Sequence, residues 1–245
     1  MKRLSVLSLS IIAALVLSAC GANFSINLFT ADEVVSQSFT ADGPTHVVVQ
    51  VFNGNIDVIT GTDSNIKIDV DKRGGGNSQD AAQADIKNVA VTMTKTGSTI
   101  NVVANRTDKR VDIGNSGASA SLKVPAGTLL ELHTSNGKVT LAGPVGDVVV
   151  TTSNGGIDVK GAGGQLNLTT SNGGITVNGG TGQLLLETSN GGLDITSDNA
   201  VVTARSSNGS ITFTGSLAKG NQSFRTDNSS ITLNLPANAS FSVNA

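Results

Sequence analysis

Short runs in which apolar and polar residues alternate occur along most of the chain. One set comprises residues 139–141, 157–159 and 175–177, and each run closely follows an Asn-Gly pair. A second set, residues 148–150 and 166–168, lies nine residues further on. Alternation with a period of two is the pattern of a β-strand that buries one of its faces. The pattern therefore predicts an all-β fold made of many short strands.

The strands recur at a fixed interval, which a four-residue motif marks. Thr-Ser-Asn-Gly, or a close variant of it, begins at residues 134, 152, 170, 188, 206 and 226. The step is 18 residues four times and then 20. A unit of this size cannot bury its own apolar face, so successive units must stack. We predict a single-stranded, β-helix-like β-solenoid with rungs of about 18 residues. Ile157 would then lie over Ile175, and Leu166 over Leu184.

Stacking would bring the asparagine of each motif over the asparagine of the next. In one interpretation the side-chain amides form a hydrogen-bonded ladder, as in other stacked β arrays. In the other, each asparagine adopts a left-handed turn conformation beside its glycine. The glycines are expected to supply the positive φ that tight corners require. Both interpretations make the asparagines a structural turn ladder, and its members are Asn136, Asn154, Asn172, Asn190 and Asn208.

Residues 38–115 show the same alternation less regularly, and we expect them to form an irregular β-rich N-terminal part that caps the solenoid. The glycine-rich segment 73–79 predicts an exposed loop. Residues 80–87 predict a short helix capped by Ser78 or Asp80. A hairpin is expected over residues 89–102. The regular repeats then occupy residues 116–245, whose last five residues read as a strand without a cap, an edge open to self-association or to a partner.

The first residues of the chain have the pattern of an export signal. Lys2 and Arg3 precede an apolar stretch over residues 4–17, which is shorter than the roughly 20 residues of a transmembrane helix. Leu-Ser-Ala-Cys at 17–20 resembles the bacterial lipobox, in which the cysteine receives a diacylglyceryl group. We predict a lipoprotein signal peptide over 1–19, with lipid, palmitate included, on Cys20. An ordinary secretory signal is the alternative.

The segment after the cysteine, residues 20–37, shows no clear period and is rich in small polar residues. We therefore expect a lipidated tether there. Its apolar residues, Phe29 among them, allow a first strand instead.

Composition restricts the chemistry that the exported chain can perform. Cys20 is the only cysteine, so lipid attachment there leaves no thiol for a disulfide, a metal or catalysis. Tryptophan and tyrosine are absent. Without Lys2 and Arg3, 14 basic residues face 18 acidic ones, a dispersed net charge of −4. No basic stripe is present, so a nucleic-acid partner is not expected.

Three arrangements of polar residues could carry chemistry. Asp158 and Asp194 would lie two rungs apart, roughly 10 Å, which is marginal for the acid pair of an inverting glycosidase. His133 could be combined with Ser135 and Asp147 as a triad, but the spacing of these residues gives no support for one. The other histidine, His46, has no recurring partner. Calcium-binding nonapeptide repeats need glycines that these units lack. We expect no enzyme, no cofactor and no metal.

The Thr-Ser-Asn-Gly-Gly units, each followed by Ile/Leu-x-Val/Ile, carry a family resemblance. Leu-Lys-Val-Pro-Ala-Gly-Thr at 122–128, echoed at 233–239, adds to it. Over about residues 38–245 the chain resembles bacterial lipoproteins of the β-strand-repeat family of unknown function that are labelled putative adhesins. The resemblance implies surface binding and assigns no binding residues.

Taken together, these features suggest a non-enzymatic protein of the cell envelope. It would be anchored to the bacterial cell membrane or outer membrane by its lipid and present the solenoid for adhesion or scaffolding to an unknown envelope or surface ligand. A carbohydrate-active enzyme on a β-helix is one alternative. An envelope-stress accessory that partners a membrane sensor is another.

Overall fold

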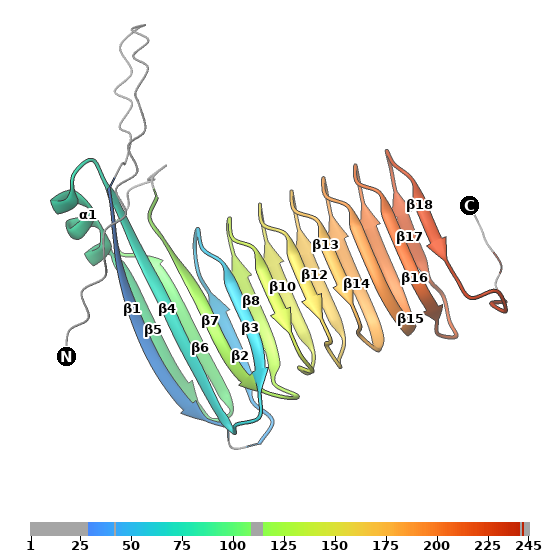
Figure 1. Cartoon of the computed structure of the whole chain (residues 1–245), viewed down its shortest axis with the longest axis horizontal. Helices are drawn as coiled ribbons and strands as arrows, with labels where there is room; N and C mark the ends of the chain where they lie inside the picture. The colour runs from blue at the N-terminus through green and yellow to red at the C-terminus, as the bar shows by residue number, and fades with distance from the viewer. Residues whose placement is uncertain (1–28, 42, 109–114, 241, 243–245) are drawn as a thin grey trace, which may run out of the picture.

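The computed structural model describes residues 29–41, 43–108, 115–240 and 242. These residues form 18 β-strands, one α-helix and one 3₁₀-helix, and the strands coil into an elongated rod (Figure 1). The predicted lipid-attachment residue Cys20 lies outside the described residues, as does most of the predicted C-terminal strand at 241–245. The fold class is confirmed: the chain is an all-β solenoid.

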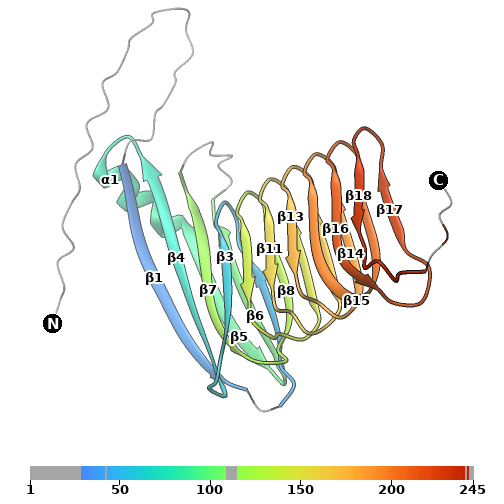
Figure 2. The same ribbon diagram turned by 45° about the vertical axis from the view of Figure 1, so that its right-hand side comes forward.

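Each rung of the regular part contributes one strand to each of two facing sheets (Figure 2). Sheet I contains β9 (Val139–Ala142), β11 (Ile157–Lys160), β13 (Ile175–Asn178), the first half of β15 (Leu193–Ser206), β16 (Ile211–Leu217) and β18 (Ile231–Asn234). Sheet II contains β8 (Leu129–Thr134), β10 (Val148–Thr152), β12 (Leu166–Thr170), β14 (Gly182–Thr188), the second half of β15 and β17 (Ser223–Thr226). All neighbours in these two series pair in parallel.

Stacking in register turns the apolar positions into continuous columns between the two sheets. Ile157 pairs with Ile175, and Leu166 pairs with Leu184, as the 18-residue step predicts. These inward side chains are almost completely buried, and the outward residues between them are exposed or half-buried. Burial of apolar surface stabilises a fold by about 25 cal/mol per Å². Rung-to-rung stacking thus supplies the core that a single unit lacks.

The N-terminal part extends both sheets without following the order of the sequence. Beyond β9, sheet I continues through β3 (Ile56–Gly61), β7 (Gly117–Pro125), β4 (Asn65–Gly76) and β1 (Phe29–Thr40). Beyond β8, sheet II continues through β2 (His46–Gln50), β6 (Thr99–Arg106) and β5 (Val89–Thr96). The rung of β2 and β3 therefore lies between β6–β7 and β8–β9. Because β7 belongs to this part, the predicted boundary at residue 115 falls one strand too early.

A short helix closes the N-terminal end. Helix α1 (Gln79–Asp85) continues into the 3₁₀-helix η1 (Ile86–Asn88) and packs against β4 and β1. The Ser78 hydroxyl accepts a hydrogen bond from the Ala81 amide and caps α1, as one of the two predicted alternatives has it. The hairpin of β5 and β6 is also as predicted.

Two predictions for this end are wrong. Residues 74–76 are not in an exposed loop: they are buried and extend β4, because their lack of a side chain lets α1 and η1 approach the sheet. The predicted tether is wrong from Phe29 onward, where β1 begins and pairs antiparallel with β4 along its whole length. The alternating residues of this segment place it in the sheet, in agreement with the alternative of a first strand.

Candidate functional site

The motif asparagines lie one above the other along one corner of the rod. Each side-chain amide donates a hydrogen bond to the side-chain oxygen of the asparagine in the preceding rung. From Asn172 onward the distance between the amide nitrogen and the side-chain oxygen runs from 2.6 Å, for Asn172 to Asn154, to 2.8 Å, for Asn228 to Asn208. The ladder comprises Asn53, Asn136, Asn154, Asn172, Asn190, Asn208 and Asn228. Of these seven residues only Asn53 has a positive φ, so the left-handed alternative does not apply to the five predicted members.

A second ladder lies directly beneath the asparagines and is buried. The Thr170 hydroxyl donates to the Gly155 carbonyl of the preceding rung at 2.8 Å and accepts from the Gly173 amide of its own rung at 3.2 Å. Thr188 repeats this arrangement with Gly173 and Gly191. The first residue of the motif, threonine in most repeats and Ser206 in one, therefore satisfies backbone groups that the corner would otherwise leave unpaired.

The motif glycines are required for space and not for φ. An added Cβ on Gly173 would lie 1.9 Å from the Gly155 carbonyl oxygen, and the other motif glycines are equally close to the rung before them. Positive φ occurs instead at the opposite corner, for example at Gly161 and Gly179. The expectation that the motif glycine supplies positive φ is therefore wrong. The threonine, the asparagine and the first glycine of the repeat are therefore all used in contacts between rungs.

Loss of one rung of the asparagine ladder should weaken the fold modestly. We expect Asn172→Ala to lower the free energy of unfolding by about 1–2 kcal/mol, because two hydrogen bonds at an exposed corner are lost. Asn167→Ala, which removes an outward side chain of the neighbouring strand β12, is the matched control and should change it by less than about 0.5 kcal/mol. Urea unfolding followed by circular dichroism measures both. Equal effects of the two substitutions would show that the ladder does not contribute.

The predicted carboxylate pair lies on the outer face of sheet I. Asp158 and Asp194 occupy one column with Thr176 between them. Lys138 and Lys160 each place an ammonium nitrogen 3.7 Å from the same oxygen of Asp158. The arrangement is a set of ion pairs on a flat strand surface, with no sugar-stacking tryptophan or tyrosine in the chain.

The two histidines meet at one carboxylate that sequence reasoning missed. Glu131 lies between them on the outer face of sheet II, with His133 Nε2 at 2.9 Å and His46 Nε2 at 3.8 Å. The Asp147 carboxylate instead accepts a hydrogen bond from the Gln165 backbone amide at 2.8 Å. Among the described interactions, neither Asp147 nor Ser135 contacts His133. The structure therefore does not assemble the triad. Glu131 precedes His133 by two residues on the same strand face, but only the pairing of β2 with β8 brings in His46.

Exposed apolar side chains continue along the same surface. We call the outer surface of β2, β8, β10, β12 and β14 the β8 face. Leu129, Val149 and Leu185 are each about 40% exposed there, and Val149 and Leu185 share one column. The β8 face thus combines ionisable and apolar groups on a regular, flat strand surface.

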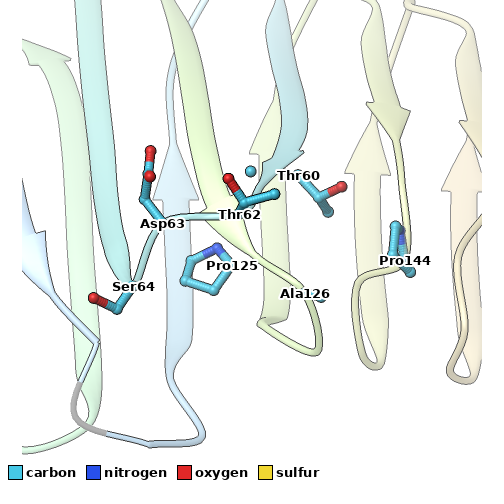
Figure 3. Close-up of a pocket in the computed structure, with 8 residues that line it drawn as sticks. Thr60, Thr62, Asp63, Ser64, Pro125, Ala126 and Pro144 are labelled. Atoms are coloured by element: carbon cyan, nitrogen blue, oxygen red, sulfur yellow. The ribbon is translucent and has the colours of Figure 1, made fainter.

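The larger of the two hollows described lies at the corner opposite the asparagine ladder. It has a volume of about 570 Å³ and is wide open to solvent. Thr60, Thr62, Asp63, Ser64, Pro125 and Pro144 line it (Figure 3). Its one carboxylate, on Asp63, is paired with Lys123 at 2.9 Å. Small-molecule sites usually enclose most of the ligand's surface, and this hollow is too open to do so.

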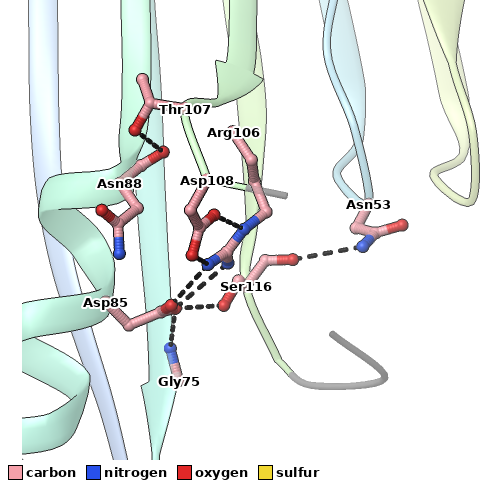
Figure 4. A network of polar contacts seen from close by, with 8 residues as sticks. All are labelled: Asn53, Gly75, Asp85, Asn88, Arg106, Thr107, Asp108 and Ser116. Atoms are coloured by element: carbon pink, nitrogen blue, oxygen red, sulfur yellow. Dashed lines mark hydrogen bonds and ion pairs between the residues drawn. The ribbon is translucent and has the colours of Figure 1, made fainter. Parts of the chain in front are cut away.

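A buried ionic network fastens the helix to the sheets (Figure 4). Arg106 donates to Asp85 at 2.7 Å and to Asp108 at 2.7 Å, and Asp85 also accepts the Gly75 amide and the Ser116 hydroxyl. Burial raises the pKa of Asp85, but these hydrogen bonds outweigh burial and hold the pKa below its usual value. The Ser116 carbonyl accepts from Asn53, so the network is continuous with the asparagine ladder.

The described residues contain no group of three or more histidine, cysteine, aspartate or glutamate side chains that could hold a metal ion. A helix of the length and apolar character needed to cross a membrane is likewise absent from the described part of the chain.

The fold places the chain in the class of two-sheeted β-solenoids. No protein-family model matches the chain, and no curated protein matches it. Among solved structures, a putative adhesin from Bacteroides fragilis is 12% identical with a TM-score of 0.39, covering 82% of this chain and 97% of that one. A putative cell adhesion protein from Clostridium sporogenes is 9% identical with a TM-score of 0.33, covering 84% and 100%. A putative lipid binding protein from Parabacteroides distasonis is 12% identical with a TM-score of 0.34, covering 81% and 96%.

Proposed function

We propose that the protein is a non-enzymatic, lipid-anchored envelope protein that presents a rigid β-solenoid for adhesion or scaffolding. One observation carries the proposal: the repeated polar residues are used between rungs, which leaves two long flat faces outside. The extended surfaces of repeat proteins bind macromolecules, whereas small substrates need pockets that enclose them. The β8 face is the surface proposed to contact the partner, because it alternates apolar with ionisable side chains around Glu131.

The proposed anchor is the lipid on Cys20. Each buried methylene of an acyl chain contributes about 0.8 kcal/mol, so two or more chains hold a protein stably at a membrane. Sheet I contains ten strands side by side from β1 to β18, and the nine spacings between them, at about 4.8 Å each, span roughly 43 Å. With β1 nearest the anchor, the β8 face would stand clear of the lipid surface.

Labelling of intact cells tests the location and the anchor together. With an epitope tag after Gly21, we expect antibody labelling without permeabilisation, and we expect Cys20→Ser to move the protein out of the membrane fraction. Leu185→Lys, on the β8 face, should then reduce the binding of these cells to an immobilised glycan or protein surface. Thr176→Lys, on the outer face of sheet I, is the matched control and should not.

Each result bears on a different part of the proposal. Labelling only after permeabilisation would end the adhesin interpretation and favour a partner inside the envelope, such as a membrane sensor. Membrane attachment that survives Cys20→Ser would refute the anchor. Equal loss of binding for both lysine variants would remove the β8 face from the proposal.

A further inference from the structure

The last rung of the rod leaves core positions open. Ile231 and Leu233 of β18 are 42% and 38% exposed. They pair with Ile211 and Phe213 of β16, which are completely buried. The side chains of the same inward columns thus change from buried to exposed between β16 and β18. This is the surface that every earlier rung covers with the next one.

The backbone of β18 is open on the same side. Within the described residues β18 forms a ladder with β16 alone, in parallel. Residues 235–240, which follow it, are not in a strand, and Leu235 packs against the core. The other edge of β18 therefore presents amide and carbonyl groups beside two exposed apolar side chains, and such an edge is a template for another strand.

The N-terminal end carries the devices that prevent edge pairing. Lys72 points inward between the sheets and forms a 2.8 Å ion pair with Glu33 of the edge strand β1. Helix α1 packs against β1 and β4. Inward charges and a covering helix are the usual protections of a sheet edge. The sequence Ile-Thr-Leu-Asn of β18 has no charge and no such cover among the described residues. The two ends therefore differ in kind.

We propose that the β18 edge binds a second copy of this chain. Its complement must be an uncharged strand that offers apolar side chains at alternate positions on the inner side, and β18 itself meets this description. A two-fold axis along the normal of sheet I would pair the two β18 strands antiparallel and keep both inner faces on the same side. Thr232 would lie opposite Thr232 of the second copy, and Ile231 opposite Leu233.

The interface joins the rods end to end. Each copy contributes one strand of four residues and two large apolar side chains, so the contact belongs to the small, transient class. Pairing at this end leaves the two N-terminal ends farthest apart. The inference rests on the described rung alone and does not depend on the lipid anchor.

Disulfide cross-linking of the full chain tests the pairing. In a Cys20→Ser background the chain has no other thiol, so a single new cysteine reports only on itself. We expect Thr232→Cys to form disulfide-linked dimers under mild oxidation, because opposite residues of an antiparallel pair lie within bridging distance. Thr140→Cys, in the same outward column but on an inner rung, is the matched control and should not.

A second substitution separates pairing from random collision. Leu233→Lys should abolish cross-linking through Thr232→Cys, since it places like charges in the interface. The native fold should persist, because this side chain is already 38% exposed, and the unfolding midpoint verifies that. Cross-linking equal to that of the Thr140→Cys control, or unaffected by Leu233→Lys, would overturn the proposal. Dimers that appear only when residues 241–245 are deleted would also overturn the proposal, because that result would mean that these residues cover the edge in the intact chain.

Discussion

Replacement of Gly173 by alanine is expected to destabilise the rod by about 3 kcal/mol, the upper end of the usual cost of overpacking, or to prevent folding. The new Cβ would lie 1.9 Å from the Gly155 carbonyl oxygen and 2.4 Å from its carbonyl carbon. Both atoms belong to backbone that a neighbouring rung holds on its other side, so they cannot move without breaking the ladders. The free energy of unfolding from urea titration gives the size of the effect.

Gly174 provides the control one residue away. A Cβ there would meet its nearest neighbour, the Gly192 carbonyl oxygen, at 3.3 Å. Alanine also restricts the unfolded chain, which stabilises by about 0.4–1 kcal/mol where the conformation allows it. We therefore expect Gly174→Ala to stay within about 1 kcal/mol of the native chain. If Gly173→Ala proved equally mild, the rungs would not be as close as described.

Arg106→Met is expected to cost about 3–5 kcal/mol, because it leaves a buried carboxylate without its counter-charge. Asp85 is only 5% exposed, and its other partners, Ser116 and the Gly75 amide, carry no charge. The loss should be concentrated at the helix-capped end. Arg73→Met is the control: it removes an exposed ion pair with Asp32 and should cost less than about 1 kcal/mol.

The pH dependence of stability separates this interpretation from a simple packing loss. The pKa of Asp85 lies below its usual value in the folded chain. The contribution of the Asp85 carboxylate to the free energy of unfolding is therefore complete above about pH 4, and it is lost as the pH falls through the lowered pKa. In Arg106→Met, burial is expected to dominate and raise that pKa. The variant's deficit should therefore shrink between pH 7 and pH 4, where the carboxyl can bind a proton. A deficit that does not change with pH would contradict the role of the charge.

The regular part of the fold could be predicted because one local rule repeats. The 18-residue step fixes which residues stack, and the pairing of Ile157 with Ile175 follows from it. The N-terminal part has no such rule. Nothing in residues 46–61 indicates that β2 lies between β6 and β8 and β3 between β7 and β9, since that order depends on pairing with strands far away in the sequence. Asn53 joins the ladder because β3 lies next to β9. Asn53-Gly54 is the same dipeptide as in the motif, but its distance from the repeats hid this role.

The surface was less predictable than the core for a physical reason. Burial constrains a column of inward residues along the whole chain, whereas an outward residue is constrained only by its immediate neighbours. His133 and Glu131 share a strand face and could have been paired from the sequence. His46 lies 85 residues from Glu131 and reaches it only because β2 and β8 are neighbours. The role of the motif glycine could not be predicted either, because a close backbone approach and a positive φ both require glycine, and the sequence does not tell the two apart.

The position of β2 and β3 between β6–β7 and β8–β9 governs how the chain becomes structured. Successive regular rungs join residues 18 apart, as Asn172 and Asn154 do, but the bond between Asn136 and Asn53 spans 83 residues. The entropy lost on closing a loop grows with its length, and distant contacts slow folding. β8 and β9 can pair with β10 and β11 through short loops, but their pairing with β2 and β3 has to close the long loop. The regular rungs should therefore form early, and the late docking of β2 and β3 onto them should set the overall folding rate.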